Sequence, residues 1–202
     1  MKLIFMRHGE ATDNVKGLIS DKEIYWSVLT ENGKKVVSET ILELPIKIDK
    51  IYVSPFPRTL QTANIVYNKY SSSDVIVDNR IREIFHGKYS GQYNNEDLDN
   101  TRQKQIAGDY LVRFGDYGEN KLEIEIRLTS FLKDVYSMND ENSTILIVSH
   151  GSVISYMKRI LGLKHSHASK GKAEVFDDVV FTGLDKYMDM LESIKNEAKN
   201  EE

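Results

Sequence analysis

Short apolar runs alternate along the chain with longer stretches in which apolar residues recur at helical spacing. A short apolar run bounded by charge, glycine or proline is typical of a buried strand, whereas apolar positions three and four apart indicate a helix. By these criteria the sequence predicts strands at 2–6, 50–53, 75–77, 144–148 and 174–181. It predicts helices at 30–44, 58–70, 121–136, 152–161 and 184–199.

The alternation of strand and helix favours one fold class. The run at 144–148 is almost continuously apolar, as expected for a strand of a parallel sheet that is covered on both faces. We therefore expect an α/β fold, a three-layer α/β/α sandwich with a mostly parallel central sheet. A polar and aromatic stretch at about 84–118 interrupts the alternation, and we interpret it as an excursion that forms part of a substrate-side wall. The length favours a single domain over 1–202.

The amino-acid composition excludes several classes of partner and of metal site. Hydrophobic residues make up 40% of the chain and charged residues 29%, which is ordinary for a globular protein. The net charge of −4 offers no basic excess, so we expect no nucleic-acid partner. No apolar run is long enough to cross a bilayer, and the absence of cysteine excludes disulfides and thiolate metal sites. We expect a cytoplasmic protein with no membrane partner; the sequence does not indicate the oligomeric state.

Charged and titratable residues follow three of the predicted strands. Arg7 and His8 come directly after the strand at 2–6, His150 follows the strand at 144–148, and Arg58 lies in the first turn of the helix after the strand at 50–53. Ligands of open α/β sheets bind at the carboxyl ends of the strands. We therefore expect these four side chains to meet there.

Two arginines and two histidines at one sheet edge indicate phosphate chemistry. Guanidinium groups bind a phosphoryl group bidentately and remain charged, so Arg7 and Arg58 are the expected phosphate clamp. His150 can donate a further hydrogen bond. A neutral His8 is a competent nucleophile toward phosphorus, and the neighbouring cations disfavour its protonated form. Because the arginines supply positive charge for the transition state, we expect no metal and no cofactor.

These residues belong to motifs that resemble a known family. In chain order they are Arg7-His8-Gly9-Glu10 with Asn14, Leu29-Thr30-Glu31-Asn32-Gly33, Ser54-x-x-x-Arg58-x-x-Gln61-Thr62-Ala63, Arg82-Glu83 with Gly87 and Gly91, and Val148-Ser149-His150-Gly151. The chain resembles the histidine phosphatase, or phosphoglycerate mutase-like, superfamily in its phosphatase branch. The resemblance covers most of the chain.

The resemblance implies a role for each matching residue. His8 matches the nucleophile that becomes a phosphohistidine, and Glu83 matches the general acid that protonates the leaving oxygen. The other matches lie in the phosphate pocket: Arg7, Asn14, Arg58, His150 and Gly151. We thus expect His8, Glu83, Arg7, Arg58 and His150 to be the catalytic residues.

The chain departs from the family pattern at several places. Ala11 stands where the family often has Ser or Thr, and Gly118-Glu119-Asn120 replaces the usual Gly-Glu-Ser. A short insertion near the expected pocket mouth contains Tyr25 and Trp26, which together with Thr30 are the expected substrate contacts. A metal-binding role for His165 and His167 is possible from their spacing, but a solvated loop is favoured. These departures concern the substrate, not the chemistry.

The expected function is a metal-independent phosphomonoesterase that acts on a small phosphorylated metabolite through a phosphohistidine on His8. Two alternatives stay open: a phosphoglycerate mutase, which returns the phosphoryl group to its substrate, and a non-catalytic module that binds a phosphorylated ligand. A phosphatase of protein phosphohistidine is disfavoured, because the small enzymes of that kind lack an acid motif like Arg82-Glu83. The aromatic excursion indicates a leaving group with a planar or apolar surface, such as a nucleoside-like or aryl group.

Overall fold

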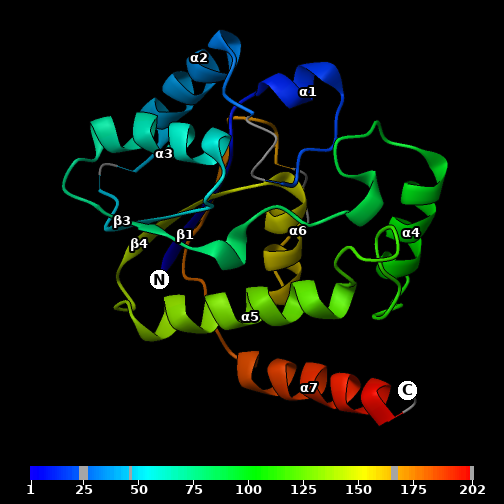
Figure 1. The fold of residues 1–202 in the computed structure, drawn as a ribbon. Coiled ribbons are helices and arrows are strands. Elements are labelled where there is room, and N and C mark those ends of the chain that lie inside the picture. Colours follow the sequence, from blue (N-terminus) through cyan, green and yellow to red (C-terminus); the bar gives the residue numbers. More distant parts are fainter. Residues whose placement is uncertain (23–26, 46, 165–167, 201–202) are drawn as a thin grey trace.

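A computed structural model describes residues 1–22, 27–45, 47–164 and 168–200. Its central sheet has the strand order β3-β2-β4-β1-β5 (Figure 1). The strands are β1 (Lys2–Arg7), β2 (Lys50–Val53), β3 (Asp74–Val77), β4 (Thr144–Ser149) and β5 (Ala173–Phe176). The first four run parallel, and β5 pairs antiparallel with β1. The expected mostly parallel α/β sandwich is confirmed.

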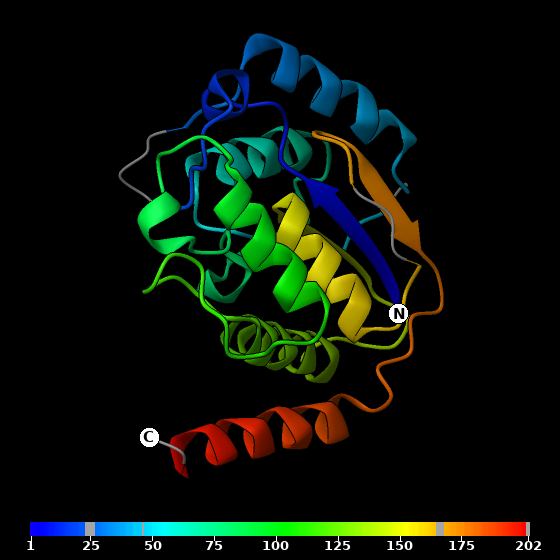
Figure 2. The same ribbon diagram turned by 90° about the vertical axis from the view of Figure 1, so that its right-hand side faces the viewer.

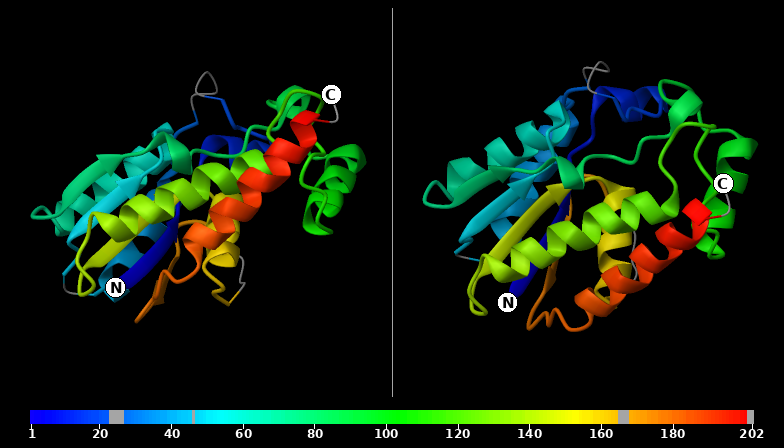
Figure 3. Two further views of the ribbon diagram at one scale, coloured as in Figure 1. Left: turned by 90° about the horizontal axis from the view of Figure 1, so that it is seen from below. Right: turned by 60° about the horizontal axis from the view of Figure 1, so that its bottom comes forward.

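Helices cover both faces of the sheet. They are α1 (Thr12–Lys16), α2 (Glu31–Thr40), α3 (Pro57–Lys69), α4 (Glu96–Ile106), α5 (Lys121–Ser137), α6 (Gly151–Ile160) and α7 (Leu184–Asn200), with 3₁₀ turns at Ile41–Glu43, Asn79–Ile81 and Gly87–Tyr89. Helices α2 and α3 pack on one face and α5 and α6 on the other. Helix α7 lies along α5 on the side away from the sheet (Figures 1 and 3).

The sequence of β1 explains this layering. Leu3 and Phe5 belong to the core beneath α5 and α6, whereas Ile4 and Met6 belong to the core beneath α2 and α3. Successive side chains of a strand point to opposite faces, so a strand without polar positions needs cover on both sides. All four side chains are inaccessible to solvent.

Several predicted elements differ from the structure in extent. The predicted strand at 174–181 stops at Phe176, because Asp178 has a left-handed backbone with φ of 52°. The helix expected to reach residue 44 tightens into a 3₁₀ turn at Ile41, which exposes Leu42 to solvent. The strand predicted at 75–77 begins at Asp74; this strand, β3, lies at the sheet edge with its residues exposed.

Two helices were not predicted. The five-residue helix α1 lies in a stretch whose asparagine and glycine favoured a loop. Helix α4 lies inside the aromatic excursion and buries only Leu98, Thr101 and Gln105, so it carries little apolar signal. Its start is fixed instead by Asn95, whose side chain accepts a hydrogen bond from the backbone N–H of Leu98. Helix α4 stands beside α6 (Figure 2).

Helix α2 begins where it touches the loop after β1. The hydroxyl of Thr30 accepts from the backbone N–H of Gly33 at 2.9 Å and donates to the Glu10 carboxylate at 2.7 Å. A Cβ atom on Gly33 would lie 2.1 Å from the Glu10 carbonyl oxygen, and one on Gly9 would lie 2.8 Å from the Gly33 carbonyl oxygen. The two glycines therefore allow the loop that follows His8 to lie directly on α2.

Replacement of Gly33 by alanine is expected to destabilise the fold by about 3 kcal/mol, because the added methyl group meets backbone that cannot move alone. Helix propensity alone predicts the opposite sign, since alanine is favoured over glycine within a helix. Urea unfolding of Gly33→Ala and of the exposed control Lys35→Ala tests this. A Gly33→Ala protein as stable as its control would contradict the packing argument.

Candidate active site

The carboxyl ends of three neighbouring strands bring the predicted site residues together. Strands β1 and β4 are adjacent, and Arg7 lies opposite Ser149 in their register, so His8 and His150 leave the sheet side by side. Their ring centroids are 5.3 Å apart. Strand β2 lies on the other side of β4, and the turn after it places Arg58 between the two rings.

The hydrogen bonds of His8 fix its tautomer. Its Nδ1 lies 2.8 Å from the carbonyl oxygen of Gly9, which can only accept, so Nδ1 carries the proton. Its Nε2 faces the Nε–H of Arg58 at 3.2 Å, which can only donate. The ring is buried, and burial and the charge of Arg58 hold the pKa of His8 well below its ordinary value of 6.5. His8 is therefore neutral and carries its lone pair on Nε2.

Arg58 contacts both histidines and is itself held by the loop before residue 22. Its Nη2 donates to the Ser20 carbonyl oxygen at 2.7 Å and lies 3.2 Å from Nδ1 of His150, while Nη1 donates to the Ser20 hydroxyl at 3.3 Å. Asp13 is buried beside it, with 3.9 Å between Oδ2 and Nη1. Sequence reasoning missed Ser20 and Asp13, because nothing in their spacing connects them to Arg58.

His150 is fully buried at the start of α6. Because Arg58 can only donate to its Nδ1, its Nε2 carries the proton and donates to the hydroxyl of Ser54 at 2.7 Å. Burial and the charge of Arg58 keep the pKa of His150 well below 6.5. In this state Nδ1 is an acceptor, so the hydrogen bond that we expect His150 to donate to phosphate stays a prediction.

Arg7 packs flat against the first residue of α6. Its Nη1 donates to the Ala168 carbonyl oxygen at 3.1 Å, and its Nε is buried without a hydrogen-bond partner among the described residues. A Cβ atom on Gly151 would lie 3.0 Å from Cζ of Arg7. The glycine at 151 thus provides space for the guanidinium group.

Glu83 completes the cluster from the opposite side. Its Oε2 lies 3.5 Å from Nδ1 of His150, and its Oε1 accepts from the backbone N–H of Ile84 at 3.0 Å. Only 17% of its side chain is exposed. The carboxyl group therefore faces the site, and it can reach an oxygen atom of a ligand that binds over the two histidines.

A buried carboxylate anchors the loop that carries Glu83. Glu119 accepts from Arg82, from the backbone N–H of Phe85 at 2.9 Å and twice from Arg127. Burial works to raise the pKa of Glu119, but Arg127 and Arg82 outweigh it and the pKa is lowered. Glu119 comes from the expected Gly-Glu-Asn motif. The part played by Arg127 was not predicted, since it lies in the middle of a helix predicted only for packing.

A family model agrees with this arrangement. The model of the histidine phosphatase superfamily (branch 1) matches residues 3–176, which include all the site residues described above. The chain belongs to this superfamily.

Similar proteins within the superfamily include phosphatases and a mutase. Phosphoserine phosphatase 1 of Hydrogenobacter thermophilus is 31% identical over 158 residues, which cover 74% of this chain and 71% of that protein. A 2,3-bisphosphoglycerate-dependent phosphoglycerate mutase of Thermoplasma acidophilum is 38% identical over 106 residues, about half (52%) of each protein. The crystal structure of the α-ribazole phosphatase of Shigella flexneri superposes with a TM-score of 0.70 at 24% identity, over 88% of this chain and 90% of that chain. The comparisons support an enzyme that is a phosphatase or a mutase.

The remaining predicted site residues of this histidine phosphatase superfamily member lie around the cluster or outside the described structure. Asn14 is half-buried, and its Oδ1 accepts from the backbone N–H of Ala11 at 3.1 Å, so this oxygen caps α1. The Thr30 hydroxyl is engaged at the start of α2. Tyr25 and Trp26 lie outside the described residues. Their expected roles in phosphate and substrate binding stay predictions.

The metal-binding groups of the described residues do not gather into a candidate metal site. No group of three or more His, Asp or Glu side chains in that part of the chain could hold an ion. His165 and His167 lie outside the described residues. None of the described helices is long and apolar enough to cross a membrane.

The two buried histidines predict how stability depends on pH. The folded-state pKa of His8 and of His150 lies well below the unfolded value near 6.5, so the unfolded chain binds more protons below that pH. The free energy of unfolding should fall as the pH falls below 6.5, by up to about 1.4 kcal/mol per pH unit for each histidine. Buried carboxylates such as Glu119 add a loss only near and below pH 4.5.

Urea unfolding at pH 7.5 and pH 5.5 measures this dependence. The variant His8→Gln removes one of the two groups and should show about half of the difference in unfolding free energy. Equal stability of the wild-type protein at the two pH values would mean that the histidines are not buried in the neutral form.

Proposed function

We propose that this protein is a metal-independent phosphomonoesterase that forms a phosphohistidine on His8. The observation that carries the proposal is the environment of the His8 ring. Gly9 fixes the tautomer, Arg58 points an N–H at Nε2, and burial keeps the ring neutral. A phosphoryl group that reaches Nε2 is therefore met by a lone pair and by the positive charge of Arg58 and Arg7.

The proposed reaction has two steps. In the first, Nε2 of His8 forms a bond to phosphorus while the bond from phosphorus to the leaving oxygen breaks, and the carboxylic acid of Glu83 gives that oxygen its proton. In the second, water attacks the phosphohistidine, Glu83 takes a proton from the water, and phosphate leaves with His8 neutral again. Arg7 and Arg58 neutralise the charge of the phosphoryl oxygens, which is the contribution that phosphoryl transfer needs most.

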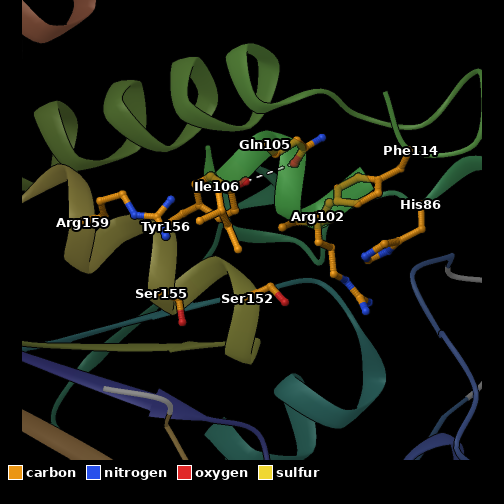
Figure 4. A pocket seen from close by; sticks show the side chains of 10 residues that line it. His86, Arg102, Gln105, Ile106, Phe114, Ser152, Ser155, Tyr156 and Arg159 are labelled. Atoms are coloured by element: carbon orange, nitrogen blue, oxygen red, sulfur yellow. Dashed lines mark hydrogen bonds between the residues drawn. The ribbon is translucent and has the colours of Figure 1, made fainter. Parts of the chain in front are cut away.

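A cavity next to the site supports a leaving group with an apolar or planar surface. It has a volume of about 190 Å³ and lies between α4 and α6. Its lining includes Ile84, which follows Glu83 in the chain, and Ser152, which follows Gly151, but none of the five proposed catalytic residues. Figure 4 shows the rings of Phe114 and Tyr156 on its walls. We propose a small phosphorylated metabolite whose leaving group extends into this cavity.

A phosphoglycerate mutase is the second candidate, and the match to the Thermoplasma acidophilum mutase favours it. The same five residues serve either reaction, because both begin by transfer of the phosphoryl group to His8. The phosphatase is preferred because the stretch from Glu83 to His150 is short. The mutases of the superfamily carry extra segments in this stretch, and those segments retain the product. A non-catalytic binding module is disfavoured, because it would not need to keep both His8 and Glu83.

Phosphate release from a panel of phosphomonoesters in the presence of EDTA tests the proposal. The panel contains aryl, nucleoside and triose phosphates and phosphoserine, with 3-phosphoglycerate also scored for isomerisation. Acid-labile and alkali-stable labelling of the protein by a ³²P ester would report a phosphohistidine. Isomerisation without release would establish the mutase instead, and a protein that neither releases phosphate nor becomes labelled would favour the binding module.

A further inference from the structure

A buried hydrogen-bonded pair, Asp21 and His86, joins two loops that the proposed reaction does not use directly. The Oδ2 atom of Asp21 accepts both from the backbone N–H of His86 at 2.6 Å and from its Nδ1 at 2.9 Å. The Asp21 side chain is inaccessible to solvent, and that of His86 is 7% exposed. The two residues are far apart in the sequence, so this contact is a property of the tertiary structure.

Each partner is directly linked to one half of the catalytic cluster. Asp21 follows Ser20, whose carbonyl oxygen and hydroxyl both accept from Arg58. His86 lies three residues after Glu83, on the same loop. Besides the contact through His150, the Asp21–His86 pair is thus a second connection, between the segment that holds Arg58 and the segment that carries Glu83.

Other contacts show that the two loops run side by side. Ile19 exchanges backbone hydrogen bonds with Gly91 and Gln92, at 2.7 and 2.9 Å. The ammonium group of Lys22 lies 5.3 Å from the ring centroid of Phe85. The Asp21–His86 pair is the buried contact among these, and a buried pair with two hydrogen bonds fixes geometry better than an exposed one.

We propose that Asp21 and His86 are positioning residues that set the location of Glu83 relative to Arg58. This inference rests on the proposed phosphatase function and adds residues that touch neither phosphorus nor the leaving oxygen. Without the pair, Glu119 still holds the Glu83 loop from its far side and Ile19 still bonds Gly91 and Gln92, but no other side-chain hydrogen bond among the described residues joins residues 84–86 to the segment of Ser20. Misplacement of a catalytic group by about 1 Å can reduce the rate by about 100-fold.

His86 has two other contacts, and each of them offers a different explanation for a defect in a His86 variant. Its ring packs on Phe114 with centroids 4.7 Å apart, and it also lines the cavity between α4 and α6 (Figure 4). Packing would require an aromatic ring at position 86. A direct substrate contact would require Nε2. The positioning role requires only a donor at the place of Nδ1.

Two substitutions separate these possibilities. His86→Phe keeps a ring and the backbone N–H that donates to Asp21 but loses the side-chain donor. His86→Asn places an amide N–H near the position of Nδ1 but loses the ring and Nε2. For phenyl phosphate, His86→Phe should lower kcat/KM about tenfold, because a poor leaving group needs Glu83 in place. For 2,4-dinitrophenyl phosphate, whose leaving group needs no proton, the loss should stay within about threefold, because only the contacts to the phosphoryl group are weakened. His86→Asn should restore most of the activity toward phenyl phosphate.

A second measurement needs no turnover. Binding of inorganic phosphate, measured by calorimetry, should weaken about threefold in His86→Phe because Ser20 and Arg58 are less well held, and His86→Asn should bind like the wild type. If His86→Phe does not fold, His86→Gln, whose longer side chain cannot place its amide at Nδ1, replaces it. Failure of the proposed function would appear as a wild-type protein no more active than His8→Ala. In that case the phosphate-binding measurement alone tests whether the Asp21–His86 pair positions Ser20 and Arg58.

The outcomes are distinct. A change in leaving-group dependence or in phosphate affinity that His86→Asn reverses supports the positioning role. Wild-type behaviour of His86→Phe in both measurements would overturn it, and so would a defect that His86→Asn shares, which would assign His86 to packing or to substrate contact.

Discussion

Replacement of His8 by alanine is expected to reduce phosphate release by at least about 10⁴-fold, because a covalent nucleophile has no substitute in the site. The only other imidazole of the cluster among the described residues, His150, directs its lone pair at Arg58 and has its N–H on Ser54. It therefore cannot take over the attack without losing these partners. Release of phosphate from phenyl phosphate by the wild-type and variant proteins, measured side by side, gives the ratio.

The same variant offers an internal control. Arg7 and Arg58 remain in place in this variant, and removal of the imidazole ring leaves more room beside them. His8→Ala should therefore still bind inorganic phosphate within a few-fold of the wild-type affinity. An inactive protein that binds phosphate assigns His8 to the chemistry rather than to the fold. Substantial activity in His8→Ala would instead exclude the phosphohistidine route.

The strands and the main helices were predictable because the residues that form the core of this fold produce apolar patterns within short stretches of the sequence. A strand such as β1, with four consecutive apolar residues, can only be stable where both faces are covered, and the alternation with helices then determines the layers. The limits of the elements depended on backbone features that the apolar pattern does not record, such as the left-handed Asp178. Helix α4 escaped prediction because capping and polar burial, not an apolar stripe, hold it.

The residues of the site also fall into a predictable and an unpredictable group. His8, Arg58 and His150 were predictable from their places after strands, because the sheet topology alone brings those places together. The roles of their partners were not. Ser20 bonds Arg58, and Ser54, although it stands in the Arg58 motif, bonds His150, both through hydrogen bonds between segments distant in the sequence. The contact of Asp21 with His86 is of the same kind. A serine or an aspartate in a loop has no pattern that distinguishes a solvated residue from one that holds an arginine.

Glu83→Gln is expected to lower kcat/KM for phenyl phosphate by about 10²- to 10³-fold, the usual contribution of a general acid. The amide keeps the shape of the side chain and its hydrogen bond to the N–H of Ile84, but it has no proton to give. For 2,4-dinitrophenyl phosphate the loss should be small, because the departing oxygen is stable as an anion. The leaving-group dependence therefore reports the proton transfer itself.

The nearby carboxylate of Glu10 provides the matched control for this experiment. It is half-buried, and hydrogen bonds from Thr30 and Asn32 lower its pKa, so it is ionised and a poor proton donor. Glu10→Gln should leave the leaving-group dependence unchanged. An equal loss on both esters in Glu83→Gln would assign Glu83 to phosphate binding or to the fold. A leaving-group dependence that appears in Glu10→Gln and not in Glu83→Gln would move the proton donor to the other side of the site.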